Sequence, residues 1–316
     1  MHKFFCLLLL LILLSVNAVD AGWKTKQAPR KLAGGEGQYF MNPRWSPDGT
    51  KLAFTETRYR GLWVMNADGT GLRQVSEEEA AGFGFEWSSD SQTLLSRVAK
   101  FENNRRYNAV KVFDLTSNST TQLTDYRTFM PGLPHWSPTN DKVYMFNREQ
   151  LEVFESGKPA LAAVATPSAA TIHFMKDGRI ALGNLATLQH QTHAPVAESE
   201  YLNLTLAPDR SKVAFEVKGG NLHVMNIDGS GLIDLGPGNR AQWSPRSDYL
   251  VYMIAGDDGH QFLAAEVYLI KCDGTEKTKL TDTEDRLEMN PSWGEGDRIA
   301  FDVMEEGEIY VLELEK

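Results

Sequence analysis

The chain has 316 residues, of which 42% are hydrophobic and 23% are charged. This composition supplies enough apolar surface for a large core and excludes an intrinsically disordered chain. The formal net charge of −10 argues against nucleic acid as a main partner, because contacts to phosphate backbones require a large basic surface.

The first 21 residues have the pattern of a secretory signal peptide. Lys3 precedes an apolar stretch over 4–16, and the small residues Ala18 and Ala21 follow it, as in a cleavable leader. The alternative is a membrane anchor, but the stretch is shorter than the roughly 20 apolar residues that a bilayer span needs. We expect cleavage near Ala18 or Ala21, a mature domain over 22–316 without a transmembrane anchor, and a periplasmic or secreted location.

A short phrase of tryptophan, serine and turn-forming residues recurs along the mature chain. Its anchors lie at positions 45, 87, 136, 174, 206, 243 and 293, so successive anchors are 32 to 50 residues apart. Each interval accommodates four short strands and their turns. Repeats of this length, built from short β segments, are typical of a radial array of small sheets. The sequence therefore predicts an all-β, seven-bladed β-propeller of four-stranded antiparallel blades.

Each repeat contains the same series of predicted strands. In the first repeat, the turn Ser46-Pro47-Asp48-Gly49 is followed by apolar segments at 51–54 and 62–66 and by a more polar outer strand, as expected at the edge of a blade. The last repeat stops after its third strand, whereas Arg30-Lys31-Leu32-Ala33 resembles a displaced fourth strand. We expect this N-terminal segment to complete the last blade and close the ring. The repeated tryptophans are expected to pack between blades.

Two stretches of the first repeat carry a family resemblance. They are Asn42-Pro43-Arg44-Trp45-Ser46-Pro47-Asp48-Gly49 and Leu62-Trp63-Val64-Met65-Asn66-Ala67-Asp68-Gly69. They resemble the repeat of TolB-type (WD-like) β-propellers of the bacterial cell envelope, and the similarity covers nearly all of the mature chain. The resemblance implies a propeller fold and an envelope location. It is less specific for function, because related repeats occur in oligogalacturonate lyases and in propeller domains of some serine peptidases; this chain has no Gly-x-Ser-x-Gly nucleophile motif.

Strand direction alternates through a blade, so the connections fall on two opposite faces of the ring. The tight turns share one face, the turn face, while longer connections at 55–61, 97–109 and 254–265 are predicted on the other, the loop face. The connections of blades one and two carry basic and aromatic residues: Arg58, Tyr59, Arg60, Lys100, Phe101, Arg105, Arg106 and Tyr107. Either the arginines pair with Glu77, Glu78 and Glu79 and contribute little, or they form a surface that recognises anions on a partner protein or an acidic glycan.

The residue before each anchor is polar or ionisable, and the first strand of each blade should line the central channel. The sequence thus predicts a polar ring of Arg44, Glu86, His135, His173, Thr205, Gln242 and Ser292. His135 and His173, on neighbouring blades, are weak metal candidates that could share an ion or a water; the alternative is that the ring groups pair within the seams. His190 and His193 are expected away from the channel mouth, and Asp257, Asp258 and His260 in a solvated hairpin loop.

These features favour an exported, non-catalytic, monomeric scaffold without a cofactor, which binds an envelope protein or an acidic glycan. The alternative is a polyuronate lyase of the oligogalacturonate type with a divalent metal in the central channel. In that hypothesis Arg44 or the basic connections would neutralise a uronate carboxylate, and His135 or His173 would lie near the reacting proton. A structural role within a larger envelope assembly is a third possibility.

Overall fold

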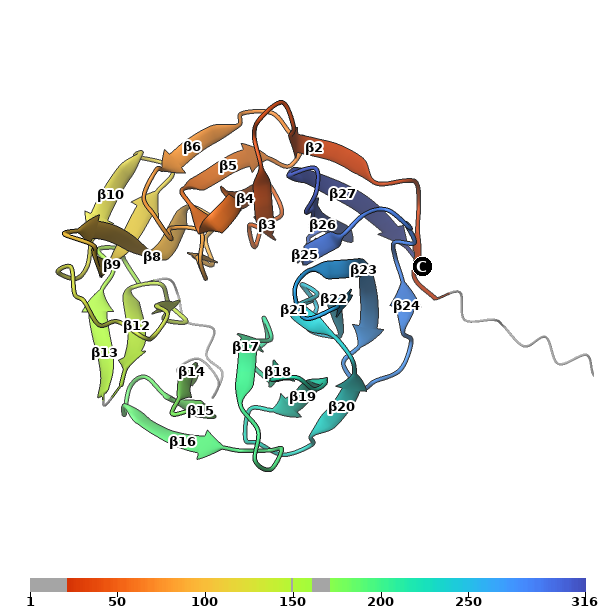
Figure 1. The fold of residues 1–316 in the computed structure, drawn as a ribbon. Coiled ribbons are helices and arrows are strands. Elements are labelled where there is room, and N and C mark those ends of the chain that lie inside the picture. The colour runs from red at the N-terminus through yellow and green to blue at the C-terminus, as the bar shows by residue number, and fades with distance from the viewer. Residues whose placement is uncertain (1–21, 149, 161–170) are drawn as a thin grey trace, which may run out of the picture.

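Seven antiparallel sheets surround a central axis in the ring of Figure 1. The structure, a computed structural model, describes residues 22–148, 150–160 and 171–316, so the predicted signal peptide lies outside the described residues. Apart from the 3-10 helix η1 (Thr57–Tyr59), every helix or strand element among them is a strand. In the described part of the chain, no helix is long and apolar enough to span a bilayer. The predicted all-β propeller with seven antiparallel blades is confirmed.

Four blades contain four strands each, ordered from the axis to the rim. Blade one contains β3 (Phe40–Trp45), β4 (Lys51–Glu56), β5 (Leu62–Asn66) and β6 (Arg73–Ser76). Blade two contains β7 (Glu86–Trp87), β8 (Thr93–Glu102), β9 (Arg105–Asp114) and β10 (Ser119–Gln122). Blade five contains β17 (Tyr201–Leu206), β18 (Lys212–Val217), β19 (Leu222–Asn226) and β20 (Ile233–Gly236). Blade six contains β21 (Asn239–Trp243), β22 (Tyr249–Asp257), β23 (Phe262–Lys271) and β24 (Thr278–Lys279).

Blades three and four each contain three strands among the described residues. Blade three contains β11 (His135–Trp136), β12 (Lys142–Asn147) and β13 (Gln150–Glu155). Blade four contains β14 (Thr171–Lys176), β15 (Arg179–Asn184) and β16 (Gln189–His193).

Blade seven is built from both ends of the chain. Its C-terminal strands are β25 (Glu288–Gly294), β26 (Arg298–Val303) and β27 (Glu308–Glu315), and both β1 (Lys24–Thr25) and β2 (Arg30–Gly34) pair with β27. The β2 pairing is antiparallel, with Arg30 opposite Val311 and Gly34 opposite Glu308. The predicted closure of the ring by the N-terminal segment is therefore confirmed, and the edge of β27 is covered.

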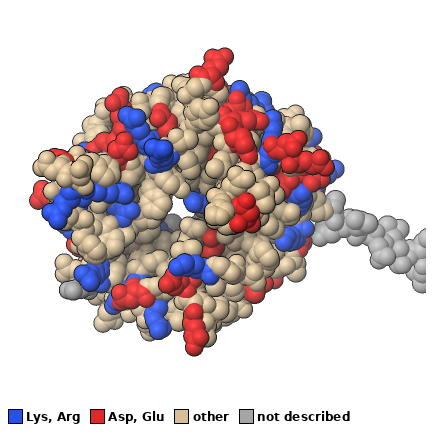
Figure 2. Space-filling view, viewed as in Figure 1, with Lys and Arg blue, Asp and Glu red and all other residues tan. Residues whose placement is uncertain are grey.

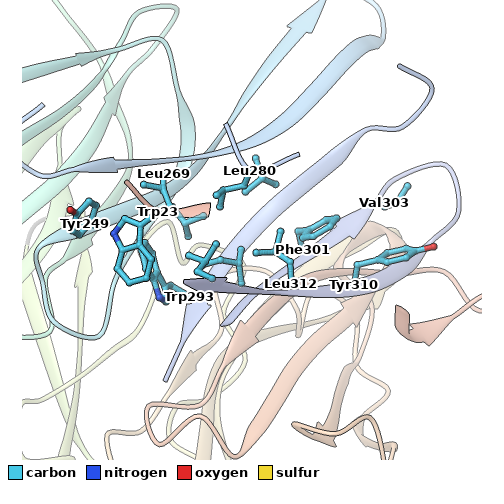
Figure 3. Close-up of a cluster of buried hydrophobic side chains, with 13 residues drawn as sticks. Trp23, Tyr249, Leu269, Leu280, Trp293, Phe301, Val303, Tyr310 and Leu312 are labelled. Atoms are coloured by element: carbon cyan, nitrogen blue, oxygen red, sulfur yellow. The ribbon is translucent and has the colours of Figure 1, made fainter. Parts of the chain in front are cut away.

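Trp23 fixes the closing segment to the seam between blades six and seven. Its ring lies edge-on to Tyr249 and to Trp293, with centroid distances of 5.9 Å and 5.8 Å. Figure 3 shows it among the buried side chains that join the two blades. Because Trp23 is only 6% exposed, it contributes a large buried apolar area where the two ends of the chain meet.

The anchor tryptophans of the repeats bridge neighbouring blades, as the sequence predicts. Trp87 donates its indole N–H to the carbonyl of Arg44 at 3.0 Å, and Trp243 donates to the carbonyl of Thr205 at 3.3 Å. Each of these bonds joins one blade to the first strand of the preceding blade. These tryptophans therefore pack as seam residues.

Two of the connections predicted as long loops on the loop face are mostly strand in the structure. Most of 97–109 belongs to the long hairpin β8–β9, and most of 254–265 belongs to β22–β23, so only the hairpin tips are loops. The sequence predicts the segment 97–109 as a loop, but Val98 and Ala109 are fully buried and lie opposite each other in the hairpin. These hairpins extend the sheets of blades two and six onto the loop face.

Candidate functional site

The first strands bring the predicted polar ring to the axis of the propeller. Except for His173, each ring residue pairs with the third residue of the second strand in its own blade. Arg44 is opposite Ala53, His135 opposite Tyr144 and Ser292 opposite Ala300. Figure 2 shows an opening at the centre of the molecule with both basic and acidic side chains close to it. The ring divides into two chemically different halves.

Blades two to four contribute a hydrogen-bonded cluster to one half of the ring. His135 Nδ1 lies 2.5 Å from Glu86 Oε1, and the rings of His135 and His173 are 4.8 Å apart. The Tyr144 hydroxyl lies 3.3 Å from His173 Nδ1 and also accepts the backbone N–H of His173. The structure thus places the two predicted histidines side by side and pairs each with a neighbouring side chain.

Burial keeps the second histidine of this cluster neutral. The pKa of His173 is well below its ordinary value, first because the ring is buried and then because His135 and Arg210 lie close to it. Two imidazoles and a carboxylate are suitable metal ligands in principle. Among the residues that the structure describes, however, no group of three or more histidine, cysteine or acidic side chains is arranged to hold a metal ion. His190 and His193 lie in β16, where His190 packs on Phe174 at 5.2 Å.

Blades five to seven and blade one use a bulge to direct backbone groups across the seams. A register shift interrupts β3, β17, β21 and β25 just before the ring residue. One residue of each bulge has a left-handed backbone: Asn42, Asn203, Arg240 and Asn290, with φ between 50° and 57°. Asparagine tolerates this conformation better than most residues.

At two seams, between blades seven and one and between blades five and six, the backbone N–H of the bulge residue donates to a buried carboxylate of the preceding blade. The N–H of Asn42 donates to Asp302 at 2.8 Å, and Asn290 Nδ2 donates to the same oxygen at 2.9 Å. In the same way, the N–H of Arg240 and the amide of Asn203 donate to Glu216, at 2.5 Å and 2.8 Å. The carboxylates satisfy backbone groups that the bulges release from the sheets.

Arg97 fills the corresponding position of blade two with the opposite charge. Its Nη1 donates to the carbonyls of Met130, Pro131 and Gly132, at 2.7 Å, 3.2 Å and 3.0 Å. Burial and the nearby Arg106 lower the pKa of Arg97 to about 10. Arg97 therefore fixes the segment that leads into β11, the first strand of blade three.

Arg44 and Arg240 make the second half of the ring cationic. Nη1 of Arg44 is buried and has no hydrogen-bond partner among the described residues, while Arg240 Nη2 donates to the Tyr59 hydroxyl at 3.4 Å. Burial and the charge of Arg240 lower the pKa of Arg44 to about 10. Burial raises the pKa of Asp302 to about 7, against the effect of its hydrogen bonds. The neighbouring carboxyl is thus a weak counterion at neutral pH.

Sequence reasoning missed Arg240, Asp302 and Glu216. A signal for the two acids exists in the repeats, because Lys-Val-Ala-Phe-Glu and Arg-Ile-Ala-Phe-Asp place a carboxyl group directly after three apolar residues of a buried strand. Arg240 carries no such signal, since only the bulge of β21 turns it toward the channel.

The predicted basic patch on the loop face is divided in the structure. Arg60 lies 3.7 Å from Glu79, as the pairing hypothesis expects, whereas Glu78 pairs with Lys111 at 2.7 Å. Other members are exposed or bound within their own hairpin: Arg58 and Arg105 are exposed, Tyr107 is half-buried, Lys100 pairs with Glu102, and Arg106 donates to Asn108. Tyr59 packs on Phe83 with a centroid distance of 5.1 Å and reaches the channel through Arg240.

The exposed apolar side chains lie mainly on the loop face. Nine of the eleven large exposed apolar residues in the described part of the chain lie in or beside its connections: Tyr39, Phe83, Phe101, Phe129, Leu188, Leu202, Phe262, Leu263 and Met304. The other two, Leu72 and Leu232, lie on the turn face. An open pocket of about 220 Å³ on the loop face is lined by Arg97, Arg106, Asn108, Thr128, Phe129, Met130 and Pro131.

No family model matches the sequence, and no curated protein matches it. Solved structures do match the fold, among them TolB from Acinetobacter baumannii, with 15% identity, a TM-score of 0.53, and coverage of 81% of this chain and 57% of that chain. The fold is a β-propeller similar to that of TolB. This chain spans little more than half the length of that TolB chain.

The propeller is also similar to proteins of other kinds. One is the β-propeller domain of Cps50 (Swd1) from Myceliophteria thermophila, with 12% identity, a TM-score of 0.62, and coverage of 90% and 99% of the two chains. Another is the GH74 enzyme of Niastella koreensis, with 12% identity, a TM-score of 0.63, and coverage of 90% and 53%. At such low identity the likeness concerns the fold alone, and the function has to be argued from the site.

Proposed function

We propose that this TolB-type propeller is an exported, non-catalytic scaffold of the cell envelope that binds a partner protein on its loop face. The observation that carries the proposal is the one-sided distribution of exposed apolar residues, nine of eleven on the loop face among the described residues. Exposed aromatic and aliphatic side chains that gather on one face supply contact area for a partner. The signal-peptide pattern at 1–21 supports export.

Aromatic and arginine side chains occur together on this face, as in the energetic centres of protein interfaces. Arg97 lies over the ring of Phe83 at 5.8 Å, and Arg148 lies over the ring of Phe129 at 5.5 Å. Arg97 is committed to the carbonyls of Met130, Pro131 and Gly132, whereas the exposed Arg148 keeps hydrogen-bond donors for a ligand beside the Phe129 ring. The partner surface that fits is therefore apolar with acidic groups.

The turn face is built differently, because its acidic residues are used within its own turns. Asp68, Asp228 and Asp273 accept hydrogen bonds from the hydroxyls of Thr70, Ser230 and Thr275, at 2.6 Å, 2.6 Å and 2.5 Å. These hydroxyl bonds also hold the pKa values of the three carboxyls below the usual range. Self-satisfied turns with few apolar side chains offer little to a partner.

A paired comparison of the two faces tests the proposal. We expect Phe101→Ser with Phe129→Ser to abolish recovery of one specific envelope protein by the tagged chain, while Leu72→Ser with Leu232→Ser leaves recovery unchanged. All four side chains are exposed, so both double variants should fold. Equal recovery by the two variants, or loss only in the turn-face variant, would contradict the proposal.

A further inference from the structure

We propose that the axial channel contains a binding site for a small anion, a carboxylate or a phosphate, between Arg44 and Arg240 at its mouth on the loop face. This inference does not depend on the partner protein. It follows from two guanidinium groups that form no ion pair within the described residues and that share the buried Asp302 as a counter-charge.

The position of the site follows from the strand directions. The first strand of each blade runs from the loop face to the turn face, and Arg240 lies two residues before the ring position of β21. Tyr59, which accepts a hydrogen bond from Arg240, belongs to η1 on the loop face. Blade seven separates the blades that carry the two arginines, and it contributes only the small Ser292 to the ring. The two arginines therefore approach the mouth from either side of a short side chain.

The charge balance at this mouth favours an anion. The arginines that form ion pairs in the described part of the chain are Arg60, Arg127, Arg246 and Arg286, so Arg44 and Arg240 are not among them. Nη1 of Arg44 is buried and has no hydrogen-bond partner within the ranges that the structure describes. A buried charge without an ion-pair partner is costly, and an anion bound beside the guanidinium group would offset that charge.

The two acidic side chains near the site, Asp302 and Glu216, already accept hydrogen bonds from the bulges. Asp302 receives the Asn42 N–H and the Asn290 amide, and Glu216 receives the Arg240 N–H and the Asn203 amide. These bonds direct the carboxylates to the backbone of the seams. A guanidinium fork suits carboxylate and phosphate equally, so the structure defines the shared chemistry and the experiment separates the two.

The test is calorimetric titration of the mature chain with inorganic phosphate and, separately, with succinate, at constant ionic strength. We expect saturable binding of at least one anion with one site per chain. Arg44→Gln and Arg240→Gln should each weaken that binding about tenfold or more, as for the loss of one charge-assisted hydrogen bond. Arg44→Lys, which keeps the charge without the fork, should retain part of it. The control is Arg179→Gln, an exposed arginine on the turn face, which should bind as the parent does.

Thermal unfolding separates a binding role from a structural one. Without added anion, Arg44→Gln should unfold at the same temperature as the parent or higher, because it removes a buried unpaired charge; the rise in unfolding temperature that the anion gives the parent should be absent. The proposal is overturned if neither anion binds, if both glutamine variants bind as the parent does, or if Arg44→Gln lowers the unfolding temperature and keeps the full anion-dependent rise. Each of these outcomes leaves the docking of a partner protein on the loop face to be judged by its own experiment.

Discussion

At the scale of single residues, the seams leave little room for change. The last repeat has Gly294 where the other four repeats with a tryptophan anchor have serine after it. A Cβ at this position would lie 2.6 Å from the ring of Trp45 in the neighbouring blade. Glycine is therefore required here by the close approach of an indole ring and not by its backbone conformation.

We predict that Gly294→Ser, which makes the last repeat look more regular, destabilises the fold by about 1 to 3 kcal/mol through overpacking. Gly256→Ser is the matched control, because nothing lies within 4 Å of a Cβ there, and it should change stability by less than about 0.5 kcal/mol. Urea unfolding measures both. Equal stability of the two variants would show that the seam can adjust.

The buried Asp302 should give the protein a characteristic pH dependence. Its pKa is raised to about 7 in the folded state by burial, so the folded protein binds the proton more tightly than the unfolded chain does. This contribution to stability is complete below the unfolded pKa of about 4 and is lost as the pH rises toward 7, with a size of up to about 4 kcal/mol.

We predict that Asp302→Asn flattens the decrease in unfolding free energy between pH 4 and 7 while keeping the acceptor for Asn42. Part of the slope should remain, because burial also raises the pKa of Glu288 to about 7. Denaturant unfolding across this pH range measures the difference between parent and variant. An unchanged slope would mean that Asp302 is ionised in the folded protein at pH 5.

At the scale of elements, the segment that closes the ring has the greatest influence on the fold. Trp23 and strands β1 and β2 attach the N-terminal segment to β27 and to the seam with blade six. An open propeller would expose the backbone groups of β27.

We predict that Trp23→Ala destabilises the protein by about 3 to 5 kcal/mol, the usual range for truncating a buried large aromatic residue. Phe101→Ala is the control, since Phe101 is 61% exposed and its loss should have little effect on stability. Guanidinium unfolding followed by tryptophan fluorescence and circular dichroism measures both. A small effect at Trp23 would mean that backbone pairing alone holds the ring closed.

The elements also show how far the sequence determines the structure. The seven anchors and the displaced strand at 30–33 were predictable, because turn residues and alternating apolar positions are local signals. The length of β8 was not predictable, because the charged Arg97 and Lys100 interrupt the apolar pattern on either side of the buried Val98 and Ala99. The cationic half of the channel was only partly predictable. Arg44 and Asp302 are 258 positions apart, and they become neighbours only when the ring closes and the bulges turn the strands.

At the scale of the whole molecule, the two faces of the ring have different chemistry. The loop face combines exposed aromatic residues, arginines and the mouth of the channel. On the turn face, the acidic side chains accept hydrogen bonds within their own turns. A closed ring of sheets whose exposed aromatic and basic side chains lie on one face suits a scaffold that holds binding groups in fixed positions.

The lyase hypothesis makes an opposite prediction at this scale. The ring of His173 is buried and its Nδ1 lies beside the Tyr144 hydroxyl, and no group of three or more histidine, cysteine or acidic side chains in the described part of the chain is arranged to hold the metal that the lyase hypothesis needs. We expect no increase in ultraviolet absorbance when the protein is incubated with polyuronates and manganese or calcium, with an authentic polyuronate lyase as the positive control. Release of unsaturated products that disappears in His135→Ala would contradict the scaffold account.

The central claim is that the loop face is the binding face, and site-specific photo-crosslinking in the intact envelope tests it most directly. A photoreactive phenylalanine is placed at Phe101 or Phe129 on the loop face, and at Leu72 or Leu232 on the turn face, all of which are exposed. The account predicts an adduct with the same protein from both loop-face positions and none from the turn-face positions. Adducts from the turn face alone, or the same adduct from all four positions, would contradict it.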